Sequence, residues 1–271
     1  MSSWYRPTAV AGTFYPKEKE ALSSMIEEWL EVGKVIPQKV TAIVAPHAGY
    51  LYSGKFAAQA YKRIHIPDRI YLLCPNHSGF GNQIAVWSEG EWETPLGTLS
   101  VDQQSAQDFL SNCGQRKGDR DAHIYEHAIE VHLPFIHTLN PAAKIIPICL
   151  GPLSLETCVS LGKALARTVQ ASKVETLLIA STDMSHYIHA DEARKKDSLA
   201  LAAIEKVDAT KLYETVAHND VSMCGFVPTT CVLEAAKLLA AKSGQIVAYG
   251  NSGEVTGDMK SVVAYAAALI Q

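Results

Sequence analysis

The sequence predicts an α/β protein with a central mixed, largely parallel sheet flanked by helices. Short apolar runs typical of buried strands alternate with segments of helical periodicity along the chain. No repeat of fixed period, low-complexity tract or linker divides it, so residues 1–271 are expected to form one domain. With 271 residues, 48% of them hydrophobic, the chain can bury one sizeable core.

The first part of the chain is expected to form a strand–helix–strand unit, preceded by a helix. Apolar residues recur at helical spacing over residues 17–32, and residues 41–45 are a buried strand pattern. A helix is predicted over residues 54–64 with Ser53 as its N-cap, followed by a strand over residues 69–74. A right-handed parallel crossover would join the two strands.

The remaining elements follow the same alternation. Residues 91–99 contain Pro and Gly and are typical of a hairpin or an edge excursion. Asp102 is expected to cap a helix that runs to about residue 113. Further strands are predicted at residues 82–87, 144–150, 174–181, 245–250 and 261–270, and further helices at residues 154–171, 191–207, 209–218 and 229–242.

Residues 123–134 (HIYEHAIEVHLP) form the most ionisable segment of the chain. We expect a helix that Pro134 ends, with His123 and His127 on one face and His132 near the C-terminus, where the helix dipole favours positive charge. The spacing does not match the zinc-protease pattern, in which Glu directly follows the first His. This segment can be interpreted either as a solvent-exposed helix face or as part of a functional site.

Polar groups follow three predicted strands at the point where each ends. His47 comes after Pro46, and His77 after Pro75, so a proline stops each strand just before its histidine. Because active groups in α/β sheets lie past the carboxyl ends of strands, the two imidazoles are expected to face one metal ion. Alone, each would be interpreted equally well as a loop histidine bonded to a carbonyl.

The third, anionic ligand has two candidates. Asp183 follows the strand over residues 174–181 together with His186, and Cys224 lies in a glycine-flanked loop before a helix. A helix N-terminus and a nearby metal both lower the pKa of a thiol. Equally, Cys224 can be a small buried residue, and Asp183 can cap the turn that follows it.

Composition and motifs exclude several classes. The net charge is -4 and no basic residues cluster, so neither nucleic acid nor an anionic membrane is expected as a partner. The N-terminus lacks an apolar signal core and no apolar run is long enough to span a bilayer, which favours a cytoplasmic protein. The six cysteines form no close CxxC pair and are expected to be reduced, buried thiols. Without a phosphate-binding glycine loop or a nucleophile elbow, phosphoryl and acyl transfer are disfavoured.

Seven motifs in order along the chain resemble those of the Memo family (mediator of ErbB2-driven cell motility). They are PTAVAGTFYP at residues 7–16, APHAGYLYSG at 45–54, PNHSG at 75–79, TPLG at 94–97, EHAIEVHLP at 126–134, STDMSH at 181–186 and MCG at 223–225. The two long motifs at residues 45–54 and 126–134 are specific, whereas MCG alone is weak.

The resemblance implies a fold similar to the class III extradiol ring-cleavage dioxygenases, with one α/β domain and a metal pocket. It implies that His47, His77 and Cys224 line the metal site, with Asp183 and His186 beside it. His186 would take the place of the acid/base histidine of those dioxygenases. A cysteine stands where they use a glutamate; its thiolate is softer, which shifts the metal preference toward copper or zinc and changes the redox behaviour of iron.

Three functions follow as expectations. The first is redox chemistry on a small molecule or O2 at an iron or copper ion, with zinc less favoured; His186 would exchange a proton, Asp183 would orient it, and Glu126, His127 and His132 would contact the substrate. The second is a non-catalytic binding module whose vestigial pocket holds a peptide or anion. The third is zinc-dependent hydrolysis with Glu126 or Glu130 as general base. Family resemblance also implies AMMECR-type and radical-SAM proteins as partners.

Overall fold

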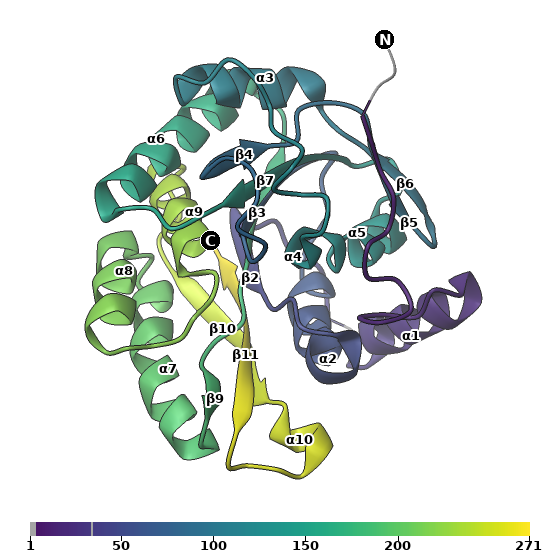
Figure 1. The fold of residues 1–271 in the computed structure, drawn as a ribbon, viewed down its shortest axis with the longest axis vertical. Coiled ribbons are helices and arrows are strands. Elements are labelled where there is room, and N and C mark those ends of the chain that lie inside the picture. Colours follow the sequence, from purple (N-terminus) through teal and green to yellow (C-terminus); the bar gives the residue numbers. More distant parts are fainter. Residues whose placement is uncertain (1–3, 34) are drawn as a thin grey trace.

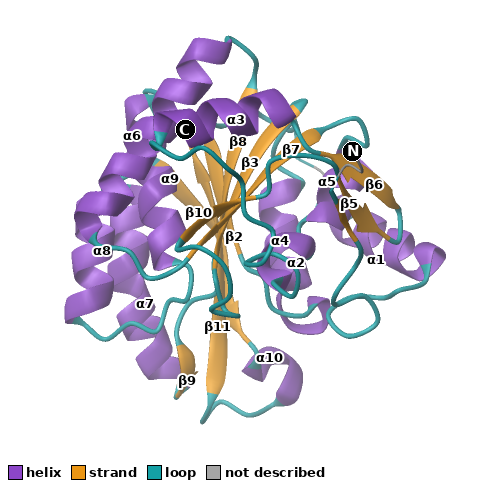
Figure 2. Cartoon of the chain, turned by 45° about the horizontal axis from the view of Figure 1, so that its top comes forward, coloured by secondary structure: helices purple, strands orange, loops and turns teal. Residues whose placement is uncertain are grey.

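The computed structural model describes residues 4–33 and 35–271 and confirms the predicted α/β fold, with a mixed sheet between two layers of helices (Figures 1 and 2). In the main sheet the strands lie in the order β10-β11-β2-β8-β3-β7-β4, and β9 pairs with β11. The central strands β2, β8, β3 and β7 are parallel, whereas β4, β9, β10 and β11 pair antiparallel with their neighbours. The strand bounds are β2 Ala42–Ala45, β3 Arg69–Pro75, β4 Ile84–Val86, β7 Lys144–Leu150, β8 Thr176–Ser181, β9 His186–Ile188, β10 Gly244–Asn251 and β11 Val262–Ile270.

A second, smaller sheet has three strands in the order β1-β5-β6, and it contains the predicted hairpin. β1 pairs parallel with β5, and β5 pairs antiparallel with β6. The bounds are β1 Tyr5–Arg6, β5 Glu91–Thr94 and β6 Gly97–Ser100. This sheet therefore ties the N-terminal segment of the chain to the hairpin.

Apolar residues on the two faces of the main sheet pack against two sets of helices. In β2, Ala42 and Val44 join the buried cluster with α3, α6, α7, α8 and α9, whereas Ile43 and Ala45 join the cluster with α1, α2, α4, α5 and the small sheet. This alternation follows from the two-residue period of a strand. The helices are α1 Lys19–Glu31, α2 Tyr50–Tyr61, α3 Gln103–Asn112, α4 His127–Glu130, α5 Leu133–Leu139, α6 Leu155–Ser172, α7 Ala190–Glu205, α8 Ala209–His218, α9 Phe226–Leu238 and α10 Gly253–Thr256. No helix within residues 4–33 and 35–271 is both long and apolar enough to cross a membrane.

The predicted start of α2 is wrong by four residues. The helix begins at Tyr50 with Gly49 as its N-cap, and Ser53 lies inside it. The Tyr50 N–H donates to the Phe14 carbonyl (2.7 Å), while the Ser53 hydroxyl donates back to the Ala48 carbonyl (2.7 Å). The first N–H group of this helix is thus satisfied by the distant Phe14 carbonyl, and not by the Ser53 cap that the sequence predicted.

The single helix predicted over residues 123–134 is also wrong. The segment forms the short helix α4 and then α5, so His123 and His127 do not share a helix face. Pro134 lies in the first turn of α5, where its missing N–H costs no hydrogen bond, and His132 is the N-cap residue of α5. A charged His132 at a helix C-terminus is therefore excluded.

Candidate metal centre

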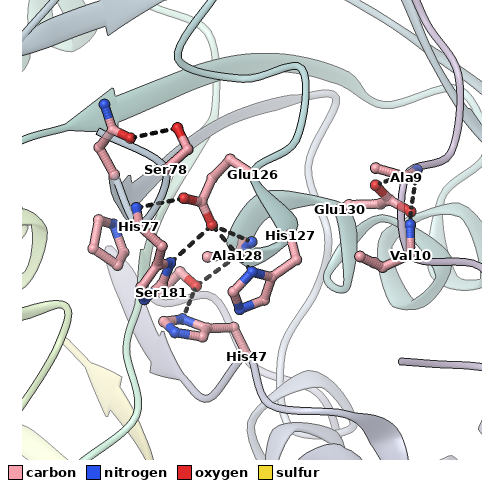
Figure 3. Close-up of polar contacts among 12 residues, drawn as sticks. Ala9, Val10, His47, His77, Ser78, Glu126, His127, Ala128, Glu130 and Ser181 are labelled. Carbon is pink, nitrogen blue, oxygen red and sulfur yellow. Dashed lines mark hydrogen bonds and ion pairs between the residues drawn. The ribbon is translucent and has the colours of Figure 1, made fainter. Parts of the chain in front are cut away.

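The parallel strands bring the predicted groups to one edge of the sheet. β8 lies between β2 and β3, and Ala45 at the end of β2 is paired with Ser181 at the end of β8. His47 and His77 therefore leave the sheet on either side of Ser181 (Figure 3). The imidazole centroids of His47 and His77 are 5.1 Å apart.

Ser181 determines which nitrogen of His47 carries the proton. Its Oγ donates to the Ala128 carbonyl (2.7 Å), an atom that can only accept. The remaining contacts of Oγ, with His47 Nδ1 at 2.8 Å and His132 Nε2 at 3.0 Å, must therefore be N–H donors. Burial lowers the pKa of His47, and neighbouring imidazoles lower it further, so the ring is neutral. Its Nε2 lone pair is left to face the cluster.

His132 is a buried support for Ser181. Its Nδ1 lies 3.0 Å from the Tyr61 hydroxyl, which donates to it, and its Nε2–H donates to Ser181. Burial lowers the pKa of His132 to about 3, so the ring is neutral. With both ring nitrogens occupied and 1% of its surface exposed, His132 sits behind the cluster.

Glu126 orients His77 in a similar way. Its carboxylate accepts from the His77 backbone N–H (2.6 Å), from His77 Nδ1 (2.9 Å) and from the Ala128 N–H (3.0 Å). Burial opposes ionisation of Glu126, but the hydrogen bond and charge of His77 bring its pKa below the ordinary value. Burial likewise opposes the charge on His77, and Glu126 raises its pKa above the ordinary value. Because Nδ1 is engaged by the carboxylate, the Nε2 atom of His77 remains for a metal.

Cys224 completes the cluster from the loop before α9. Its Sγ lies 3.3 Å from His47 Nε2 and accepts from the Asp183 backbone N–H (3.3 Å). Burial raises the pKa of the thiol, and the nearby Asp183 carboxylate raises it further. One donor atom each from His47, His77 and Cys224 lies within 4.8 Å of the others.

The donor set fits a transition metal. Such ions hold nitrogen at about 2.0–2.1 Å and sulfur at about 2.3 Å, which places two donors of a tetrahedral ion roughly 3.3–3.6 Å apart. The 3.3 Å between Cys224 Sγ and His47 Nε2 is about 0.3 Å shorter than the separation that these bond lengths give for a nitrogen and a sulfur ligand, so a small outward shift would admit the ion. Two imidazoles and a thiolate suit iron, copper or zinc rather than magnesium or calcium.

His77, Glu126 and His127 form a second group of donors with this spacing. Here the separations are those of hydrogen bonds and ion pairs, with Glu126 Oε1 lying 2.9 Å from His77 Nδ1 and 3.4 Å from His127 Nδ1. Burial lowers the pKa of His127 to about 4 despite the adjacent carboxylate. We therefore interpret Glu126 as a group that positions the imidazoles.

Asp183 and His186 lie beside the cluster. Oδ1 of Asp183 accepts from the N–H groups of His47 (2.8 Å) and Ala48 (3.4 Å), while Oδ2 is 3.9 Å from His47 Nε2. Burial raises the pKa of Asp183 to about 6, although both of these hydrogen bonds oppose the shift. His186 Nδ1 lies 2.9 Å from the Ser222 carbonyl and donates to it, which leaves its Nε2 as a proton acceptor.

An open cavity of about 370 Å³ adjoins these groups. Among the predicted site residues, His127, Asp183 and His186 line it, so a ligand there can reach all three. The other lining residues are Phe14, Ala48, Gly49, Tyr52, Tyr187, Ser252, Thr256, Val263 and Tyr265.

Glu130 is separated from the cluster by its own contacts. Its carboxylate accepts from Arg6 Nη1 (2.6 Å), from the Tyr15 hydroxyl (2.6 Å) and from the N–H groups of Ala9 and Val10 (2.9 and 3.0 Å). Figure 3 shows this carboxylate turned away from His47 toward the N-terminal segment. These contacts leave no position for a metal-bound water, so Glu130 does not serve as a general base.

Sequence reasoning missed two serines: Ser181, which orients the His47 ring, and Ser222, which orients the His186 ring. Ser181 was within the STDMSH motif, and its position at a strand end was the available signal. Ser222 acts through its backbone carbonyl as well as its hydroxyl, which donates a weak hydrogen bond to the His186 carbonyl and accepts from the His186 N–H. A backbone acceptor has no side-chain signature, so no pattern could indicate it.

Glu126→Gln is expected to lower the metal affinity by about 10–100-fold, the usual effect of losing a group that orients a metal-binding histidine. An amide replaces one acceptor oxygen with a donor, which opposes an N–H of His77 or Ala128. Competition with a chelator of known affinity measures the change. Glu28→Gln, on the exposed side of α1, is the control, and an affinity within twofold of wild type for Glu126→Gln would refute the orienting role.

Gly225→Ala is expected to lower metal affinity by at least about tenfold, because a Cβ at this position would meet the Ser181 carbonyl and lie 2.5 Å from Thr182 Cβ. The loop that holds Cys224 would have to move away from β8. Gly244→Ala is the matched control, since its Cβ would lie 2.5 Å from the Ile204 carbonyl, at the opposite end of the sheet. Equal losses of affinity in the two variants would mean that the effect is general destabilisation.

The fold and the converging donors define an α/β protein with a candidate transition-metal centre at the carboxyl edge of its parallel strands. The family model described as Memo-like protein matches residues 6–269. A MEMO1 family protein of Aquifex aeolicus is 41% identical over 261 residues, which cover 96% of this chain and 97% of that protein. A MEMO1 family protein of Methanosarcina acetivorans is 39% identical over 267 residues, covering 98% and 99%. The chain therefore belongs to the Memo-like protein family.

A likeness to a solved structure supports the fold alone. The crystal structure of an uncharacterized protein from Escherichia coli K12 aligns with a TM-score of 0.50 at 12% identity, over 84% of this chain and 99% of that one. At this identity the likeness extends to the arrangement of helices and strands.

Proposed function

We propose that the chain is a metal-dependent redox protein that holds iron or copper through His47, His77 and Cys224. The observation that carries the proposal is the orientation of the two imidazoles. Ser181 and Glu126 each engage an Nδ1 atom, so that both Nε2 atoms remain for a metal beside the Cys224 sulfur. When bound, such a metal would supply one-electron chemistry toward a small molecule or O2.

The protein's own groups would bind the substrate and move a proton. His186, fixed by the Ser222 carbonyl, presents Nε2 as the proton acceptor or donor. Asp183 holds the His47 backbone and places a second carboxylate oxygen near the same cavity. His127 and Glu126 would position the substrate and the His77 ring, and His132 would act indirectly through Ser181.

The experiment compares protein reconstituted with iron, copper or zinc for O2 consumption in the presence of a small reductant. Turnover with iron or copper and none with zinc supports the proposal, and His186→Asn should reduce turnover while retaining the metal. Turnover that survives in His47→Ala would contradict it, since His47 supplies a ligand at the centre of the cluster.

A second candidate is a non-catalytic module that binds a peptide or another ligand in the same cavity. The exposed Tyr187 at its rim favours this reading, because large exposed aromatic side chains are common in binding sites. A protein that binds a peptide but shows no turnover with iron, copper or zinc would support this second candidate. Zinc-dependent hydrolysis is less favoured, because Glu130 is fully engaged and Glu126 already accepts hydrogen bonds through both oxygens.

Location and protein partners are part of the same proposal. All six cysteines are free, which supports a reducing, cytoplasmic location. AMMECR-type and radical-SAM proteins are proposed as partners through family resemblance, and co-purification from native cells would test this.

A further inference from the structure

The cavity beside the metal centre has an unusual wall composition. Four aromatic rings, from Phe14, Tyr52, Tyr187 and Tyr265, contribute to its lining. The described residues that line it include one carboxylate, Asp183, and two imidazoles, His127 and His186, but neither Lys nor Arg. Aromatic faces carry negative charge density and attract cations that lie over them.

Asp183 contributes a carboxylate to the lining of this cavity. Oδ1 is engaged by the His47 and Ala48 N–H groups, whereas Oδ2 receives no hydrogen bond from the described residues. The residue is 4% exposed and lines the cavity. The buried, unpaired side-chain atoms of the described residues do not include Oδ2, so this oxygen is accessible and can accept a hydrogen bond from a ligand.

Tyr187 is an exposed ring held by an uncommon backbone conformation. Its φ is +58°, a region that side chains larger than Gly, Asn or Asp seldom adopt, and the residue is 77% exposed. It is the extra residue of a β-bulge in β9, because His186 and Ile188 on either side of it pair with the adjacent Val263 and Val262 of β11. A bulge of this kind re-aims a side chain, and here it accompanies an exposed ring in the cavity lining.

We propose that this cavity binds an organic ammonium ion, such as a primary amine or an alkylated ammonium group. A cavity of about 370 Å³ has room for a small ammonium group, and a cation in contact with one of these rings lies within the ~6 Å over which an aromatic face attracts it. Asp183 Oδ2 supplies the opposite charge and accepts an N–H where the ligand has one. An anionic ligand would find no guanidinium or ammonium group in this wall.

The inference concerns the cavity wall and goes beyond the metal chemistry proposed above. Cys224 and His77 do not belong to the wall, and the ammonium site requires neither. Cys224→Ser therefore separates the two proposals, because it removes a metal ligand and should leave binding of the ammonium ion intact.

The test compares choline with its uncharged carbon isostere, 3,3-dimethylbutan-1-ol, by NMR titration of the metal-free protein. The two probes have the same shape, so their difference reports the charge. We expect choline to bind at least about tenfold more tightly, with the same preference in Cys224→Ser. Acetate of matched ionic strength should not compete.

Tyr187→Leu and Asp183→Asn should each weaken choline binding at least about fivefold. Tyr125→Leu, which alters another exposed tyrosine that does not line the cavity, should leave it unchanged. Equal binding of the two probes, absence of choline binding, or undiminished binding by Tyr187→Leu would overturn the proposal. Because Tyr187 is exposed, its replacement tests the site even if Asp183→Asn fails to fold.

Discussion

Glu130→Ala is expected to lower the free energy of unfolding by about 3–5 kcal/mol, the usual effect of removing one partner of a buried ion pair. Arg6 and Glu130 are 1% and 0% exposed, with 2.6 Å between Nη1 and Oε2. The variant leaves a guanidinium charge buried without its carboxylate. It also removes the acceptor for the Tyr15 hydroxyl and for two backbone N–H groups.

Urea unfolding of the metal-free protein measures this loss, with Glu28→Ala as the exposed control. The double variant Arg6→Met, Glu130→Leu is expected to be more stable than Glu130→Ala, because it removes the stranded charge together with its partner. A loss below about 1 kcal/mol in Glu130→Ala would mean that water or another group replaces the carboxylate.

Cys224→Ser is expected to lower the affinity for copper or iron more than about 100-fold, since changing a group that merely orients a ligand already costs about 10–100-fold. Serine has nearly the same shape, so the loop can keep its conformation, but its hydroxyl is a poor ligand for a soft ion. Chelator competition measures the affinity. Cys113→Ser is the control, because Cys113 is a half-buried cysteine at the C-terminal end of α3 and does not belong to the group of metal donors. If Cys224→Ser and wild type bound copper or iron with equal affinity, the Cys224 thiolate would not be a metal ligand.

The strand-end histidines could be predicted because their signal is local. A proline ends the run before His47 and another before His77, and both strands lie where the pattern places them. What brings the two residues together is the insertion of β8 between β2 and β3. Strand order depends on packing across the whole sheet, so the apolar pattern alone could not specify it.

The errors at α2 and at residues 123–134 have one physical origin. A local cap at Ser53 and a helix-ending Pro134 are both sound local rules, yet tertiary contacts overrode each. Phe14 supplies the acceptor that starts α2, and Arg6 holds the His123 and Glu126 carbonyls by hydrogen bonds of 2.8 and 2.6 Å. A buried arginine more than 100 residues away thus fixes a turn that the local sequence favours as helix.

The role of Cys224 could not be predicted from its local sequence. A cysteine before a helix indicates a reactive thiol as readily as a buried one, and its neighbours in the fold are 41 residues away at Asp183 and 177 away at His47. Only the family resemblance favoured Cys224 over Asp183 as the third ligand. In the structure Sγ lies 3.3 Å from His47 Nε2, and Cys224 stays the predicted third ligand.

Elemental analysis of anaerobically purified protein tests the central claim most directly, because it needs no knowledge of the substrate. Wild type should contain close to one iron or copper per chain, and His77→Ala and Cys224→Ser purified in parallel should have lost it. Wild-type protein that carries no metal, and takes up none when iron, copper or zinc is added, would contradict the metal centre.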